Sequence, residues 1–579
     1  MLHYLIERRL QETVTAVCPS ADTSQILVRP CVNSQFGDYQ SNALMGLAKQ
    51  KKMNPRRLAE SVKERLDVGD YCEAVEIAGA GFLNFRLKNS AVVEVLKGAC
   101  RGEHLFLQKS GKPRTIVIDF SSPNVAKPMH VGHIRSTILG DCLARTFRFM
   151  GHRVITDNHL GDWGTQFGKL LVGWRRHLDP AALAADPIGE MERLYRLVNE
   201  ACDSEAEVLE SARQELVKLQ KGDPDNLAIW QKMIALSREQ FDAIYGRLGV
   251  QFDFCLGESY YNPRLKSVVD QLVEAGMARE SEGAMVVFFE DISELKAHPA
   301  IILKSDGAAN YTTTDLATLL YRVETWRPDE IIYVTDARQQ LHFKQVFTIF
   351  RRWQPQARPR LAHVWFGTIL GEDGKPFKTR SGAIIKLADL LDEAEERAYQ
   401  VVTAKNPELD EERRREIARI VGIGAIKYAD LLPNRQSDYV FSWDKMLALN
   451  GNTAPYLLYA YTRIRSIFRR LSESSEAVYQ LAEAADRPWS LTVVEEVVLA
   501  KHLLNLGLVL EAVSEEYRPN YLCNYLYELA GHFARFYETC PVLKAGGDER
   551  FQRLALCDLT SQVLQMGLGI LGIETTDQM

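Results

Sequence analysis

The sequence predicts an α/β protein in which a doubly wound parallel (Rossmann-like) domain lies between a small N-terminal α/β domain and an all-α C-terminal bundle. Three patterns predict this fold class. A β-rich run at 115–120, a helical stretch and a second strand-like run at 153–157 form a βαβ pattern. Further strand-like runs occur between 284 and 369, and the pattern is helical from about 387 to the end.

These elements divide the chain into successive segments. Near the N-terminus, Leu2, Ile6, Leu10 and Val14 recur every four residues, as on one helical face, and 75–87 is a strand-like run. The expected segments are an N-terminal α/β domain at 1–110, a central α/β domain at 111–385 with a charged helical insertion at about 170–260, a connecting helical segment at 386–446 and a helical domain at 447–579.

Length and composition bound the possible classes of protein. A chain of 579 residues is too long for one compact domain, and 46% hydrophobic with 25% charged residues is typical of a globular protein. This composition excludes a mostly disordered chain, a collagen and a disulfide-rich miniprotein. The formal net charge of −6 means that a nucleic-acid partner would require a local basic face.

The cysteines and the first residues indicate a compartment. The 10 cysteines are scattered without a C-x-x-C pair, which argues against zinc fingers and a disulfide framework and favours a reducing environment. Charge appears at Glu7, before an apolar signal-peptide core could form. No stretch approaches the ~18 apolar residues needed to cross a bilayer. We therefore expect a cytoplasmic protein with no membrane partner.

The most informative segment runs from Asp119 to Asp141, D-F-S-S-P-N-V-A-K-P-M-H-V-G-H-I-R-S-T-I-L-G-D. It follows the first strand of the βαβ unit, where parallel sheets bind ligands, and it opens a helix whose N-terminal N–H groups can bind phosphate. His130 and His133 would present imidazoles at that end, and Gly132 would let a nucleotide lie against the main chain. H-V-G-H alone fits a capped helix with surface histidines about equally well, and a metal pair is a further alternative.

The wider context resembles the signature of arginyl-tRNA synthetases, a class I family, with H-V-G-H as their form of the HIGH motif. Further matches follow in the family's order, namely D-N-H-L-G-D-W-G-T-Q-F-G at 157–168, K-S-D-G at 304–307, Y-T-T-T-D-L at 311–316, Y-V-T-D-A-R-Q-Q-L-H-F at 333–343, G-K-P-F-K-T-R at 374–380 and G-N-T-A-P-Y-L-L-Y-A-Y-T-R at 451–463. The resemblance therefore spans essentially the whole chain.

The resemblance implies an arginine pocket. A planar guanidinium needs carboxylate and hydroxyl acceptors, and Tyr311 and Asp315, four residues apart, would share one helix face. Alone, the pair would fit an ordinary helix N-terminal acid beside a half-buried tyrosine. The family assigns both to the guanidinium. It assigns the other arginine-binding roles to Asp119, as a second acid, and to Ser121, Asn124 and Gln339 at the α-amino and carboxylate end.

The resemblance also implies a phosphate clamp, because the substrate carboxylate attacks the α-phosphorus of ATP without a protein nucleophile. His130 and His133 would donate to the developing charge, and Lys127 would share the pyrophosphate charge. In the counterpart of the family's KMSKS loop, either Lys378 or Arg380 replaces the catalytic second lysine; a solvated basic turn is the alternative. The expected ATP contacts are Pro123, Met129, Val131, Gly132, Gly161 and Asp162. Mg²⁺ would accompany ATP, with no metal held tightly by the protein.

Two regions are expected to contact tRNA. The segment 33–42, N-S-Q-F-G-D-Y-Q-S-N, suits stacking on an unpaired base, and the family assigns Asn33 and Phe36 to the tRNA elbow; a tight polar turn is the alternative. The tail resembles the family's anticodon-binding bundle, with Tyr456 and Arg463 as expected contacts, although such aromatics also form bundle cores. G-x-G-x-x-G at 567–572 lies too near the end of the sequence for a nucleotide-binding crossover, so we interpret it as a helix end.

The resemblance therefore implies an arginine–tRNA ligase, a monomer, whose partners are tRNA(Arg), L-arginine and ATP, and which needs tRNA for the activation step. The alternatives are a class I synthetase for another amino acid, a small-molecule nucleotidyltransferase with an H-x-G-H motif, and a catalytically inactive RNA-binding protein. A cysteine enzyme would show zinc-ligand cysteines, which are missing. A nucleotidyltransferase would not need the long helical tail, and the intact His130, His133, Asn124 and Asp315 weigh against an inactive protein.

Overall fold

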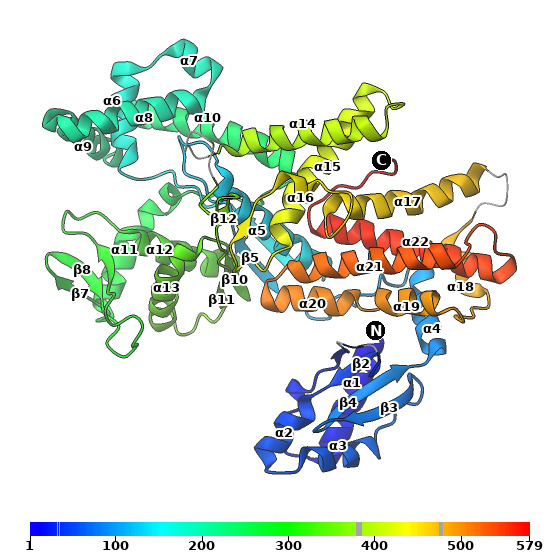
Figure 1. The fold of residues 1–579 in the computed structure, drawn as a ribbon. Helices are drawn as coiled ribbons and strands as arrows, with labels where there is room; N and C mark the ends of the chain where they lie inside the picture. Colours follow the sequence, from blue (N-terminus) through cyan, green and yellow to red (C-terminus); the bar gives the residue numbers. More distant parts are fainter. Residues whose placement is uncertain (32, 34, 378–384, 474–478) are drawn as a thin grey trace. The chain divides into compact units, whose positions relative to one another are not determined.

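The chain forms two compact units, shown as a ribbon in Figure 1. The structure is a computed structural model and describes residues 1–31, 33, 35–377, 385–473 and 479–579. The first unit comprises Met1–Lys109, Ala448–Gly569 and Glu574–Met579, and the second comprises Ser110–Leu447 and Ile570–Ile573. Apart from residues 110, 447 and 570–573, the expected N- and C-terminal domains fall in the first unit, and the expected central domain and connecting segment fall in the second.

A parallel four-stranded sheet of order β11-β10-β5-β6 lies at the centre of the second unit. Its strands are β5 (Thr115–Asp119), β6 (Arg153–Asp157), β10 (Glu330–Tyr333) and β11 (Arg360–His363). Helix α5 (Val131–Phe149) connects β5 to β6, and α13 (Gln340–Trp353) connects β10 to β11. The strand order reverses between β5 and β10, which is where doubly wound sheets bind ligands at the carboxyl ends of the strands. The predicted fold class is confirmed.

The other elements of the second unit surround this sheet. Five helices follow β6, where the insertion was expected: α6 (Gln166–His177), α7 (Pro180–Ala185), α8 (Pro187–Ser204), α9 (Ala206–Gln220) and α10 (Pro224–Leu248). Next come the short helix η2 (Glu258–Tyr261), α11 (Asn262–Glu274), the antiparallel strands β7 (Ala278–Ser281), β8 (Ala284–Val287) and β9 (Ala300–Leu303), and α12 (Tyr311–Trp326). The unit also contains η3 (Ala337–Gln339), β12 (Ile369–Leu370), α14 (Leu387–Lys405), α15 (Glu411–Leu431), β13 (Tyr439–Val440) and α16 (Trp443–Met446).

The N-terminal part of the first unit is an antiparallel sheet of order β1-β2-β4-β3 with helices (Figure 1, blue). Its elements are α1 (Leu2–Val17), η1 (Thr23–Gln25), β1 (Arg29–Pro30), β2 (Tyr39–Ser41), α2 (Ala43–Lys51), α3 (Pro55–Lys63), β3 (Cys72–Ala78), β4 (Phe82–Leu87) and α4 (Asn89–Cys100). Leu2, Ile6, Leu10 and Val14 are all buried on α1, as their spacing predicts. The expected single strand at 75–87 is instead a hairpin, because the positive φ angles of Gly79 (52°) and Gly81 (129°) turn the chain between β3 and β4.

The C-terminal part of the first unit is helical. Its helices are α17 (Ala454–Glu473), α18 (Leu481–Asp486), α19 (Val494–Leu503), α20 (Leu506–Glu516), α21 (Asn520–Thr539) and α22 (Gly547–Ile570). Gly567 and Gly569 lie within the last turns of α22, and Gly572 follows with a φ of 73°, so the G-x-G-x-x-G sequence is a helix end, as interpreted above.

One segment of this bundle contradicts the expectation that no stretch is apolar enough to span a bilayer. Val494–Glu516 is long and apolar enough by length and composition. In the structure it is two helices, α19 and α20, and 56% of the apolar window is buried within the protein. Packing of both helices in a bundle core explains an apolar composition that extends over more than one helix face.

Candidate active site

The loop between β5 and α5 adopts an unusual backbone. Ser121, Ser122 and Ala126 have φ angles of 71°, 49° and 62°, a region that side chains with a Cβ rarely occupy. Side chains of other elements hold each of their N–H groups, with Ser121 donating to Ser136 at 2.8 Å, Ser122 to Asn158 at 3.0 Å and Ala126 to Ser237 at 3.0 Å. Strain of this kind persists where the surroundings enforce it, and it is typical of binding sites.

The paired histidines lie where this loop enters α5. His130 is the N-cap, and its Nδ1 accepts a hydrogen bond from the N–H of Gly132 at 3.0 Å. The Nδ1 of His133 accepts from the N–H of His130 at 3.1 Å. Because both Nδ1 atoms accept, each neutral ring carries its proton on Nε2. The ring centroids are 4.0 Å apart. The site therefore offers a pair of imidazole N–H donors beside a helix N-terminus.

Both rings are held in the neutral form. Burial lowers the pKa of His133 to about 3, and the proximity of His130 adds to this shift. Burial, followed by the positive charges of Arg338 and Lys127, also lowers the pKa of His130. Gly132 makes room for His130: a Cβ at this position would lie 2.8 Å from the His130 ring, so glycine allows that ring to fold over the first turn of α5.

Asn124 and Gly161 form a second part of the site. The N–H of Val125 donates to the carbonyl of Gly161 at 3.0 Å, and the N–H of Gly161 donates to the carbonyl of Pro123 at 3.1 Å. A Cβ on Gly161 would lie 2.2 Å from the Oδ1 of Asn124. Gly161 thus leaves room for an exposed Asn124 amide at the carboxyl edge of the sheet, while Pro123 is buried and acts through its carbonyl.

Asp119 has a different partner from the one expected. Its Oδ2 lies 2.6 Å from Nη2 of Arg322 on α12, and Oδ2 of Asp157 lies 2.8 Å from the same nitrogen. Arg322 is fully buried, so its charge is compensated by these two carboxylates alone among the described acids in ion-pair range. The carboxylates at the ends of β5 and β6 therefore hold α12 against the sheet, and Asp119 is not left free for a substrate guanidinium.

An acidic cluster lies at the start of α12. Asp315 Oδ2 is 2.5 Å from Nε2 of His342 on α13, and Tyr311, one turn before Asp315, is 68% exposed. Burial, followed by the negative charges of Asp315 and Asp162, raises the pKa of Glu258 to about 8, and the charge of Glu258 in turn helps to raise the pKa of Tyr311. Tyr311 and Asp315 therefore share one face of α12 and lie near two further acids, Glu258 and Asp162.

Glu258 was missed by the sequence analysis. It lies in η2, 57 positions before Asp315 in the chain, and its local sequence, G-E-S-Y-Y at 257–261, contains no recognisable motif. Asp162 determines its position, because the carboxylate accepts from the N–H of Ser259 at 2.8 Å and from its hydroxyl at 2.7 Å. Asp162, expected at the ATP, thus holds the turn that presents Glu258. No described residue forms an ion pair with Glu258 in the structure.

The remaining expected residues are placed as follows. The hydroxyl of Ser121 lies 2.8 Å from both the Tyr245 hydroxyl and the Thr137 hydroxyl, inside the protein. Gln339 is exposed at the end of η3, before α13. Lys127 is exposed, with Nζ 5.2 Å from the ring centroid of Tyr195 on α8. Val131, the first residue of α5, is buried. Lys378 and Arg380 lie outside the described residues.

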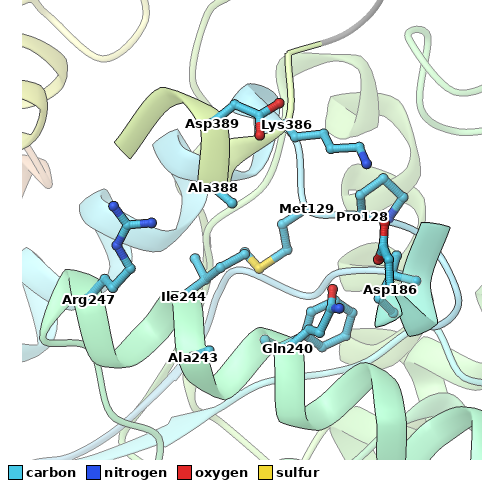
Figure 2. A pocket seen from close by; sticks show the side chains of 12 residues that line it. Pro128, Met129, Asp186, Gln240, Ala243, Ile244, Arg247, Lys386, Ala388 and Asp389 are labelled. Carbon is cyan, nitrogen blue, oxygen red and sulfur yellow. The ribbon is translucent and has the colours of Figure 1, made fainter. Parts of the chain in front are cut away.

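A cavity of about 390 Å³ adjoins the site, and Figure 2 shows it from close by. It is lined by residues of the 128–129 segment, α8, α10 and the start of α14. The Met129 side chain lies in it between Ile244 and Ala388 (Figure 2). Main-chain bonds join the two chain segments beside it: Val131 N–H donates to the carbonyl of Ile385 at 3.0 Å, and Leu387 N–H donates to that of Met129 at 2.9 Å. Met129, expected at the ATP, is buried and lines this cavity.

The expected tRNA contacts lie in the first unit. Asn33 Oδ1 accepts from the N–H of Gln35 at 2.9 Å, and the Phe36 N–H donates to the Asn33 carbonyl at 3.1 Å. This tight turn leaves the Phe36 ring 57% exposed, and stacking of the ring on an unpaired base stays a prediction. On α17, the Tyr456 ring packs against Tyr527 at 5.5 Å. The Arg463 guanidinium lies 4.7 Å over the Tyr537 ring of α21.

The fold and the histidine pair at its switch point define a class I aminoacyl-tRNA synthetase, and the family models agree. The model of the catalytic domain of class I (R) tRNA synthetases matches 97–443. The arginyl tRNA synthetase N terminal domain matches 2–87, and the DALR anticodon binding domain matches 457–579. Curated relatives match over nearly the full length. The chain belongs to the arginyl-tRNA synthetase family.

Two relatives and two solved structures illustrate the similarity. The arginine--tRNA ligase of Marinomonas sp. (strain MWYL1) is 44% identical, with 99% of each chain covered, and that of Proteus mirabilis (strain HI4320) is 45% identical with the same coverage. The arginyl-tRNA synthetase of Plasmodium falciparum has a TM-score of 0.82 at 28% identity and covers 100% of this chain and 99% of its own. The Thermus thermophilus enzyme, at 24% identity and full coverage of both chains, shares the fold with a TM-score of 0.83.

Proposed function

We propose that this arginine–tRNA ligase forms arginyl-adenylate from L-arginine and ATP·Mg²⁺ at the carboxyl edge of β5 and β10, and then transfers arginine to the 3′-terminal adenosine of tRNA(Arg). The observation that carries the proposal is the acidic cluster of Glu258, Asp162 and Asp315, which lies at the same edge of the sheet as the histidine pair. The acidic cluster would bind a cation, and the histidine pair would bind an anion.

The acidic cluster supports arginine as the amino acid. Burial and neighbouring acids raise the pKa of Glu258 to about 8, and no described residue forms an ion pair with it, so a bound cation would stabilise its ionised form. A guanidinium supplies the charge and can bind carboxylates through parallel N–H groups, with the Tyr311 hydroxyl as a further acceptor. A lysine ammonium offers fewer donors and would leave part of this acceptor set unpaired, which gives a basis for selectivity. Asn124 and Gln339 are exposed and can reach the α-amino and carboxylate end.

The histidine pair supports the chemistry at phosphorus. In the activation step an arginine carboxylate oxygen forms a bond to the α-phosphorus, while the bond from that phosphorus to the bridging oxygen breaks and pyrophosphate leaves. The neutral Nε2–H groups of His130 and His133 donate to the phosphate oxygens where charge accumulates. The exposed Lys127 adds a positive charge at the same end for the pyrophosphate.

The second step needs the tRNA in place. A hydroxyl of the terminal ribose attacks the acyl carbon of the adenylate, the acyl–phosphate bond breaks and AMP leaves. The exposed Phe36 ring on its tight turn suits stacking on an unpaired base, and Tyr456 and Arg463 on α17 suit contacts with the anticodon arm. We also propose that the protein is a cytoplasmic monomer and that tRNA is required for the activation step.

The test is to charge a total tRNA pool with each amino acid in turn. We expect incorporation of arginine alone. Pyrophosphate exchange into ATP with arginine should depend on added tRNA(Arg), and equal exchange without tRNA would contradict that part of the proposal. His130→Asn and Asp315→Asn should each abolish most of the charging. If both variants charged tRNA at the rate of the parent protein, the site would be wrongly assigned.

A further inference from the structure

Arg135 is a buried cation close to the histidine pair. It lies on α5 two residues after His133 and is 2% exposed. Its Nη1 donates to the carbonyl of Gly367 at 2.7 Å and to that of Ser437 at 3.3 Å. Its Nε lies 3.0 Å from Oδ1 of Asp430, which is also buried. The guanidinium therefore has its partners on two stretches of chain far from α5 in the sequence, at 367 and at 430–437.

Aromatic rings enclose the same guanidinium. Its central carbon lies 5.7 Å from the Phe366 ring centroid and 5.1 Å from that of Tyr439. Burial raises the pKa of Asp430, although the charge of Arg135 and a hydrogen bond from the Tyr439 hydroxyl oppose the shift. A buried ion pair of this type is a weak source of stability, because an apolar pair of similar size often stabilises a protein as well or better. A role in fixing the position of α5 relative to Gly367, Asp430 and Ser437 explains this buried ion pair better.

Two partners of Arg135 lie next to β12 and to the strand that pairs with it. Gly367 lies just before β12, and Ser437 lies just before β13, which pairs with β12 in parallel register (Ile369↔Tyr439). The approach is close, because a Cβ on Gly367 would lie 2.7 Å from the main chain of Ser437. The Thr368 N–H also donates to the Asp438 carboxylate at 2.6 Å. The position of β12 relative to α5 therefore depends on the guanidinium.

β12 continues into a basic turn. Gly371 N–H donates to the carbonyl of Lys375 at 2.7 Å, and Phe377 N–H donates to the carbonyl of Ile369 at 3.0 Å. The Phe377 ring stacks on Phe441, just beyond β13, with centroids 4.5 Å apart. The turn that carries Lys375 is thus attached to the same β12–β13 pair that Arg135 fixes. Residues 385–387 are in turn bonded to the loop in front of α5, as described above.

We propose that Arg135 is a positioning residue, which sets the spacing between the His130–His133 donors of α5 and the β12 segment with its basic turn. The inference rests on the proposed function of the two histidines. The groups on α5 and those beyond β12 can act together only on the triphosphate of ATP, which is present in the activation step and absent in the transfer step. A change in their spacing should therefore slow activation much more than transfer.

The test measures both steps in Arg135→Met and Arg135→Lys. Activation is followed as tRNA-dependent pyrophosphate exchange, and transfer is followed from chemically prepared arginyl-adenylate supplied to enzyme and tRNA(Arg). We expect Arg135→Met to lower kcat of exchange on the order of 100-fold, the loss typical of a misplaced reacting group, with KM for arginine nearly unchanged. Transfer should fall by no more than about threefold. Arg135→Lys should recover part of the exchange rate, because its ammonium can satisfy Asp430 but not both carbonyls.

A matched control separates positioning from stability. Arg553 forms a buried ion pair with Glu496 at 2.7 Å in the first unit. Arg553→Met should lower the thermal stability as Arg135→Met does, but leave the ratio of exchange to transfer unchanged. If Arg135→Met fails to fold, Gly367→Ala replaces it, since its Cβ pushes β12 away without removing a charge.

Two results would overturn the inference: an equal loss of exchange and transfer, or no loss of either in a folded variant. His130→Asn distinguishes this failure from failure of the proposed function. If His130→Asn lowers exchange while Arg135→Met and Gly367→Ala do not, only the positioning role is wrong. If His130→Asn has no effect, the assignment of the histidines is wrong and the positioning role falls with it.

Discussion

The raised pKa of Glu258 gives arginine binding a pH dependence of predictable sign and size. Burial raises this pKa to about 8, so at pH 7 roughly one molecule in eleven carries the ionised carboxylate. The guanidinium favours the ionised form and does not itself titrate in this range. The apparent Kd for arginine should therefore fall about tenfold between pH 7 and pH 9, which corresponds to about 1.4 kcal/mol.

Proton release provides a second, independent measure. Binding at pH 7 should displace the proton of Glu258, and the expected release from this group is about 0.9 proton per arginine bound. Isothermal titration of L-arginine into the protein at pH 7, 8 and 9, repeated in buffers with different ionisation enthalpies, gives both the Kd and the number of protons. The sign follows from the raised pKa: the unliganded protein holds the proton below pH 8, and arginine competes with it.

Glu258→Gln is the control for this prediction. The variant keeps the shape of the side chain but cannot ionise, and it shares with the parent protein any titration of the substrate α-amino group. Arginine should bind it more weakly at pH 9, and the difference in pH slope between the two proteins should be close to tenfold over the range. The same slope and the same proton release in both proteins would refute the reasoning.

The remaining predictions concern the other parts of the site. Asp315→Asn should raise KM for arginine in pyrophosphate exchange at least about 30-fold, since loss of one charged partner costs about 2 kcal/mol or more. Glu324→Gln, an exposed acid on the same helix, should leave that KM unchanged, and equal effects of the two variants would contradict the pocket. Phe36→Ala should raise KM for tRNA roughly tenfold through lost base stacking, worth about 1–3 kcal/mol, without changing KM for arginine or ATP. If KM for tRNA stays constant, the ring does not contact tRNA. Because burial lowers the pKa values of His130 and His133, the kcat of exchange at saturating arginine should show no inflection near pH 6.5, the usual histidine pKa. A titration near pH 6.5 that disappears in His130→Asn would show that a charged ring is involved.

Local sequence was sufficient where the feature is itself local. The start of α5 with its paired histidines depends on chain spacing of three residues, and the shared face of Tyr311 and Asp315 depends on a spacing of four. The fold class could be predicted for the same reason, because buried parallel strands and short connections leave a pattern in the sequence. Glycines were harder: Gly79 and Gly81 were not recognised as a turn, since the apolar pattern continues on both sides of them.

The partners of the charged side chains could not be predicted locally. Asp119 was expected to face the substrate, but it forms an ion pair with Arg322 on α12, which is 203 positions away in the sequence. Met129 lines a neighbouring cavity, and Asp162 holds the turn that presents Glu258. In each case the side chain has several possible partners in the sequence, and only packing determines which one is within reach.

The sequence by itself determined the kind of protein, through motifs that carry the chemistry of a class I synthetase and through helix and strand periodicities that fix the doubly wound domain. The tertiary structure alone decided which acids remain free to bind a cation. That choice depends on burial and on distances of a few ångströms between elements far apart in the chain, because charge interactions and desolvation act through space and not along the sequence.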